Sequence, residues 1–224
     1  MEEILCAVPT YKWMDDTPFK RWAEAASEEN KDLFNRVCEL SDLFADMIFS
    51  QDTPTYEFIR CQSKLSGSDE WVDAEVQLPE PLKYFSYTFF TYHMADLNGY
   101  GGKFDMQDRT LTVDLSNFGN DPVLLHEMIH LHEFVINDLP MIYHDAVLYC
   151  LYKDLADKIP NLNERIEAHG HILNAGKIAR IGGVHDILFL LKSFDLDLKM
   201  GYKLGTVFGY GMEDEWDGSP SAET

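Results

Sequence analysis

The sequence lacks long apolar runs. The longest candidate, residues 187–191, is ended by Lys192 and followed by Asp195, whereas a membrane-spanning helix needs about twenty apolar residues. No membrane partner is therefore expected. The N-terminus carries Glu2 and Glu3, where a secretory signal would have basic residues before an apolar stretch. A cytoplasmic location is the resulting expectation.

Clustered cysteines and basic segments are also missing. The four cysteines are Cys6, Cys38, Cys61 and Cys150. They form no CxxC pair, which excludes a zinc ribbon within this chain. We therefore predict reduced, mostly buried thiols. The sequence has 18 Lys and Arg and 39 acidic residues, which gives a net charge of −21. The most basic short segment, residues 177–180, carries only two positive charges. Because such a field repels polyanions, nucleic acid is not expected as a partner.

What the sequence does have is globular composition, with 46% hydrophobic and 13% aromatic residues over 224 positions. We predict one domain over residues 1–212, with its core at about 110–160, and an acidic, flexible tail over 213–224. The pattern predicts helices at 19–48, 121–137, 144–159 and 185–194 and a strand at 110–115. Two short apolar stretches lie at 55–60 and 71–78, the aromatic segment at 82–94 is ambiguous between strand and helix, and extended segments are expected after residue 194.

The central motif is His126-Glu-Met-Ile-His130, which is HExxH. Its helix is predicted to start with Asp121 as the N-cap and Pro122 in the first turn. Residues four apart share one helix face, so the two imidazoles can converge on a single tetrahedral zinc ion. The carboxylate of Glu127 then lies beside the metal-bound water, where it serves as the general base. An ordinary amphipathic helix with two solvated histidines is the competing interpretation.

A catalytic zinc needs a third protein ligand. His132 points away around the helix axis, and Glu133 lies too far along the helix to close a tetrahedron. We predict His144, which opens the next helix, as the third ligand. An acid at Glu164 or Glu167 is the alternative. The remaining candidates are Asp145 and three histidines that we interpret as structural or exposed, His169, His171 and His185.

The motif followed by His144 resembles the SprT-like zincin metallopeptidases. In that family the third ligand follows the second histidine by about a dozen residues, and here thirteen residues separate His130 from His144. The resemblance covers residues 110–159 and implies an α+β, zincin-like fold with a small mixed sheet, an active-site helix and additional helices. The sequence differs from the family pattern at Asp145, where glycine is usual. It also lacks the C-terminal zinc ribbon that many members carry. Many members act on DNA-associated proteins, which the acidic balance disfavours here.

The function predicted from these residues is a zinc-dependent metallopeptidase that hydrolyses a peptide or protein substrate. A zinc hydrolase of a small amide or ester remains open, because HExxH fixes the mechanism and not the substrate. A non-catalytic, zinc-stabilised binding protein is the non-enzymatic alternative. Nothing in the sequence chooses the group that stabilises the oxyanion among the candidates Tyr92, His93, Tyr143 and Tyr202.

Overall fold

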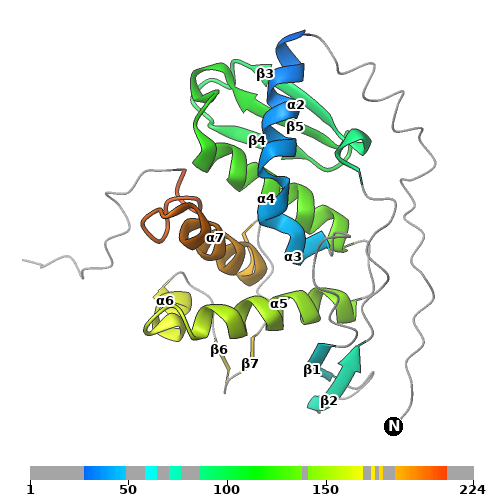
Figure 1. Ribbon diagram of the computed structural model, residues 1–224, viewed down its shortest axis with the longest axis vertical. Coiled ribbons are helices and arrows are strands. Elements are labelled where there is room, and N and C mark those ends of the chain that lie inside the picture. Colours follow the sequence, from blue (N-terminus) through cyan, green and yellow to red (C-terminus); the bar gives the residue numbers. More distant parts are fainter. Residues whose placement is uncertain are drawn as a thin grey trace, which may run out of the picture.

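The computed structural model describes residues 28–48, 59–64, 71–76, 86–137, 141–168, 173–174, 177–178 and 185–210. It is a mixed α+β structure in which a small three-stranded sheet lies at one end, and several helices with two short two-stranded sheets form the rest (Figure 1). The predicted tail over 213–224 lies outside the described residues. Within the described part of the chain, no helix is both long and apolar enough to span a bilayer.

The sheet has three strands in the order β3-β5-β4. Strand β3 (Thr91–Ala95) pairs in parallel with β5 (Thr110–Asp114), and β4 (Gly102–Asp105) pairs antiparallel on the other side of β5. The predicted strand at 110–115 is therefore confirmed. Four of its five residues are buried, because helix α2 (Glu28–Leu40) packs against β3 while α4 (Asp121–Asn137) packs against β4 and β5. The ambiguous aromatic segment ends in β3, after a short 3-10 turn, η3 (Tyr87–Phe89).

Helix α4 (Asp121–Asn137) carries the motif, and its boundaries match the prediction. The predicted cap is corrected, however. The carbonyl of Asn120 accepts the first helical hydrogen bonds, from the backbone of Val123 and Leu124. The carboxylate of Asp121 is instead paired with Arg36 on α2, which donates from Nε at 3.0 Å. This ion pair ties the N-terminal end of α4 to α2.

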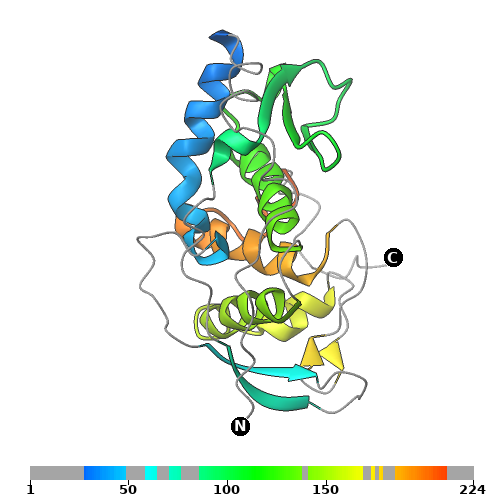
Figure 2. The ribbon, with the colours of Figure 1, turned by 90° about the vertical axis from the view of Figure 1, so that its right-hand side faces the viewer.

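Helices α4 and α7 (Ile187–Met200) form the centre of the molecule. Every residue from 123 to 133 and from 187 to 197 is buried. Helix α7 contacts both α4 and α5 (Met141–Ala156), and it lies between them in both views (Figures 1 and 2). Because α4 and α7 are covered on every side over these residues, neither helix shows a clear polar face in its sequence.

The remaining elements surround this centre. The predicted helix at 19–48 is resolved into α2 (Glu28–Leu40), η2 (Ser41–Phe44) and α3 (Ala45–Ile48), and residues 19–27 lie outside the described part. Strands β1 (Ile59–Lys64) and β2 (Trp71–Val76) form an antiparallel hairpin against α5. The extended segments expected after residue 194 are wrong, since α7 continues to Met200 and turns follow as far as Tyr210. The other short elements are η4 (Leu115–Asn117), α6 (Leu162–Ala168), β6 (Leu173–Asn174) and β7 (Lys177–Ile178).

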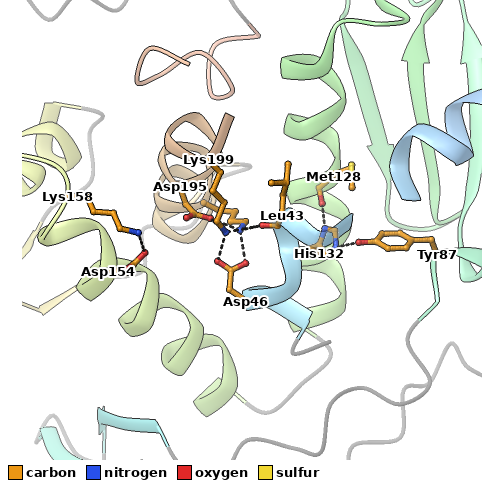
Figure 3. Close-up of polar contacts among 10 residues, drawn as sticks. Leu43, Asp46, Tyr87, Met128, His132, Asp154, Lys158, Asp195 and Lys199 are labelled. Carbon is orange, nitrogen blue, oxygen red and sulfur yellow. Dashed lines mark hydrogen bonds and ion pairs between the residues drawn. The ribbon is translucent and has the colours of Figure 1, made fainter. Parts of the chain in front are cut away.

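A buried ionic cluster joins α7 to η2 and α3. Lys192, whose side chain has no exposed surface, donates to Asp195 and Asp46 at 2.7 Å each and to the carbonyl of Leu43 at 2.6 Å. Lys199 also reaches Asp46 (Figure 3). Every donor of the buried ammonium thus has an oxygen partner, which offsets the cost of removing it from water.

Candidate metal centre

His126 and His130 lie on the same face of α4. Their side chains are one helical turn apart, and the ring centroids are separated by 5.3 Å. Both residues are buried, with exposed fractions of 0% and 8%. The spacing of four residues places two imidazoles toward one point, as the helix geometry predicts.

The third imidazole at this point belongs to His185, which precedes α7. His126, His130 and His185 are the one group of ligand-type residues in the described chain that could hold a metal ion, with their ligand atoms all within 4.8 Å of one another. Nε2 of His185 is 3.1 Å from Nε2 of His126. The sequence analysis grouped His185 with the structural or exposed histidines; in the structure it is half-buried and its ring lies beside those of His126 and His130.

The hydrogen bond on the far side of His126 decides which nitrogen faces the group. Nδ1 lies 3.0 Å from the carbonyl oxygen of Val207. Because a carbonyl can only accept, Nδ1 carries the proton and Nε2 presents its lone pair toward His185. Burial lowers the pKa of His126 to about 3 and of His130 to about 4, and it also lowers the pKa of His185. Three neutral imidazoles are the form that binds a metal.

The spacing of these nitrogens suits a metal ion. A tetrahedral zinc with Zn–N bonds of about 2.0–2.1 Å requires neighbouring nitrogens about 3.3 Å apart. The 3.1 Å separation between His126 and His185 is close to that value. Three imidazoles are also the complete set of protein ligands in one known type of catalytic zinc site, which leaves a fourth position open.

Glu127 lies under the edge of the sheet. A Cβ atom added at Gly102 would be 2.6 Å from Cγ of Glu127, so only glycine permits β4 to approach this closely. The hydroxyl of Tyr210 donates to Oε1 of Glu127 at 3.1 Å. Burial raises the pKa of Glu127 to about 7, against the opposing effect of that hydrogen bond. A carboxylate with a pKa near neutrality is well suited to accept and release a proton.

Tyr210 was missed by the sequence interpretation. Its ring is stacked on His126 with centroids 4.1 Å apart. Its φ is +58°, an uncommon conformation for a bulky residue that is often found at functional sites. No local pattern marks this tyrosine, because it lies on a turn far along the chain from the motif.

A chain of polar contacts lies behind the three histidines. Nδ1 of His130 is 3.3 Å from Oε2 of Glu133, and Glu133 is hydrogen-bonded to Asp186. Burial and the neighbouring charge of Asp186 raise the pKa of Glu133 well above its usual range. Nε2 of His144 lies 3.7 Å from Oδ2 of Asp186.

His144, which the sequence predicted as third ligand, lies outside the group of three histidines. Helix α5 begins at Met141, three residues before the predicted start at His144, and Nε2 of His144 faces Asp186 at the start of α7. Glu164 and Glu167 are exposed on α6 and are also outside the group. His169 and His171 lie outside the described residues.

His132 points to the opposite side of α4, as the helical spacing predicts. Its Nδ1 donates to the carbonyl of Met128 at 2.6 Å, and its Nε2 is 2.9 Å from the hydroxyl of Tyr87 (Figure 3). Its ring is stacked on Phe44 at 4.2 Å. These contacts give His132 a structural position between α4 and the N-terminal helices.

Two of the candidates for oxyanion stabilisation, Tyr92 and His93, have their described contacts away from the three histidines. Tyr92 is buried and donates to the carbonyl of Tyr87 at 2.9 Å. His93 is exposed and contacts Asn30. The side chain of Tyr143 lies outside the described part of the structure. Of the tyrosines in this part, Tyr210 is the one shown to contact both His126 and Glu127.

Comparisons with known proteins give no family. No protein-family model, curated protein or solved structure matches the chain. The resemblance to SprT-like metallopeptidases therefore remains a prediction, and the proposals below rest on the arrangement of side chains.

Proposed function

We propose that this protein is a zinc-dependent hydrolase that cleaves peptide bonds, with zinc on His126, His130 and His185. The observation that carries the proposal is the meeting of three neutral imidazoles beside a buried carboxylate that immediately follows the first of them. A zinc ion in such a site acidifies a bound water and polarises a carbonyl group. The three side chains would hold the ion, and the fourth position would be left for water and substrate.

Glu127 is the general base of this mechanism. Burial brings the pKa of its carboxyl group to about 7, so it accepts a proton from the attacking water and can return one to the leaving amine. Tyr210 holds Oε1 of this carboxylate from the side of His126. This hydrogen bond restricts the orientation of the carboxylate, which favours the geometry needed for proton transfer.

A peptide substrate is favoured over a small amide by the neighbouring strand. In the described part of the sheet, β4 pairs with β5 on one side and is the edge strand on the other. Its first residue, Gly102, is in close approach to Glu127. An extended peptide can add to such an edge through main-chain hydrogen bonds, which would bring one of its carbonyl groups to the base.

The test compares Glu127→Gln with Glu167→Gln, a matched change on the exposed face of α6. We expect both variants and the parent to bind one zinc per chain in elemental analysis. In digests of a peptide library followed by mass spectrometry, Glu127→Gln should lose about two to four orders of magnitude in rate, and Glu167→Gln should match the parent. A parent that binds no zinc would refute the metal site. Full activity in zinc-loaded Glu127→Gln would refute the role of the base and leave the metal site standing.

A further inference from the structure

The residue after His185 has more partners than a helix cap needs. Asp186 is the N-cap of α7, and Oδ1 accepts from the backbone of Phe189 at 3.1 Å. Its carboxylate also interacts with Glu133 from α4, and its Oδ2 lies 3.7 Å from Nε2 of His144 on α5. The carboxylate of Asp186 therefore lies where α4, α5 and α7 meet, directly after His185.

These contacts bear on the position of His185. His185 precedes the helix, so its backbone is not fixed by the helical hydrogen bonds of α7. The cap at Asp186 sets where that helix begins, and the contact with Glu133 sets where the cap lies relative to α4. Glu133 in turn contacts Nδ1 of His130 at 3.3 Å, so the same pair of carboxyl groups reaches two of the three histidines.

We infer that Asp186 is a positioning residue that holds His185 against His126 and His130, and that His144 acts through Asp186 and is not a metal ligand. This inference rests on the proposed zinc site. Side chains that contact ligands from behind orient them, and their loss commonly weakens metal binding by about 10- to 100-fold. His144 contributes by approaching Asp186 from α5, with Nε2 at 3.7 Å from Oδ2.

A purely structural cap makes a different prediction. Asparagine caps helices about as well as aspartate, so Asp186→Asn keeps the hydrogen bond from Phe189 while it replaces the carboxylate that faces Glu133 and His144. A cap alone would leave the zinc affinity of Asp186→Asn unchanged. A positioning carboxylate would not. Asp154→Asn is the matched control, because Asp154 is exposed and pairs with Lys158 away from the site.

The experiment measures zinc affinity of the full chain by competition with a chromophoric chelator. We expect Asp186→Asn and His144→Ala to bind zinc about 10- to 100-fold more weakly than the parent, Asp154→Asn to match the parent, and His185→Ala to be weakened far more than either. The visible spectrum of the cobalt-loaded protein should shift in Asp186→Asn, because it reports the ligand geometry, and should be unchanged in Asp154→Asn.

The outcomes separate the two proposals. Parent zinc binding with an unchanged affinity in Asp186→Asn would overturn the positioning role and leave the proposed metal site intact. A loss in His144→Ala as large as that in His126→Ala, with little change in His185→Ala, would show that His144 is the ligand and would also overturn it. A parent chain that binds no zinc would remove the proposed function, and this inference with it. If His185→Ala does not fold, His185→Gln gives the same comparison.

Discussion

Gly102→Ala tests whether β4 and Glu127 are fitted to each other. The new Cβ would lie 2.6 Å from Cγ of Glu127 and 3.1 Å from Cδ, whereas carbon atoms pack best at about 3.5–4.0 Å. Because the nearest atom is Cγ and not the end of the side chain, a rotation of the carboxylate alone does not relieve the clash. The strand cannot yield easily either, since the backbone of Asp114 donates to the carbonyl of Gly101 at 2.9 Å.

The cost can be estimated from this geometry. Overpacking of a fitted core costs about 1–3 kcal/mol. Gly102 is not in the left-handed region, so alanine should recover about 0.4–1 kcal/mol by restricting the unfolded chain. We expect Gly102→Ala to lower the free energy of unfolding in the parent but to raise it slightly in a Glu127→Ala background, where the clashing atoms are absent. The coupling between the two sites should be about 1–3 kcal/mol.

The assay is urea unfolding of the parent, the two single variants and the double variant. Gly101→Ala is the control, because the atoms nearest to its new Cβ belong to Tyr210 and Val123, both at 3.3 Å, so its effect should differ much less between the two backgrounds. Zinc binding should survive in Gly102→Ala, while hydrolysis should fall about 100-fold if the carboxylate is displaced by about 1 Å. Additive stability effects at Gly102 and Glu127 would refute the reasoning.

Two further predictions concern Tyr210 and the buried ionic cluster. Tyr210→Phe removes the hydrogen bond to Glu127 at 3.1 Å but keeps the ring on His126, so hydrolysis should fall about tenfold with unchanged zinc affinity; equal turnover in both proteins would contradict this. Burial opposes ionisation of Asp46, but Lys192 and Lys199 outweigh it and lower the pKa of Asp46. A lowered pKa in the folded state gives stability that is present above about pH 4 and is lost as the pH falls through the folded value. Asp46→Asn should therefore cost about 1–3 kcal/mol at pH 7, and the difference from the parent in urea unfolding should shrink in acid; a difference that is constant with pH would count against the ion pair.

The elements with a clear local pattern were predictable. The alternation of polar and apolar residues from Thr110 to Leu115 indicated β5. The prolines near both ends and the spacing of the apolar residues indicated α4 with its correct ends. Helix caps were less certain, because a carboxylate near a helix start has more than one possible partner. Asp121 illustrates this, since Arg36 from α2 takes its side chain. The sequence cannot show that partner, because it comes from a distant helix.

The sequence by itself determined the pair His126 and His130 and the place of Glu127 between them, because a rigid helix converts a spacing of four residues into one face. Only the tertiary structure decided the rest of the site. His185, Tyr210 and Gly102 reach α4 because α7, the turn after it and β4 pack there. His144 has the nearer position in the chain and meets Asp186 instead. Distance along the chain fixes contacts within one helix, whereas contacts between elements depend on how buried surfaces pack, and that packing placed α7 between α4 and α5.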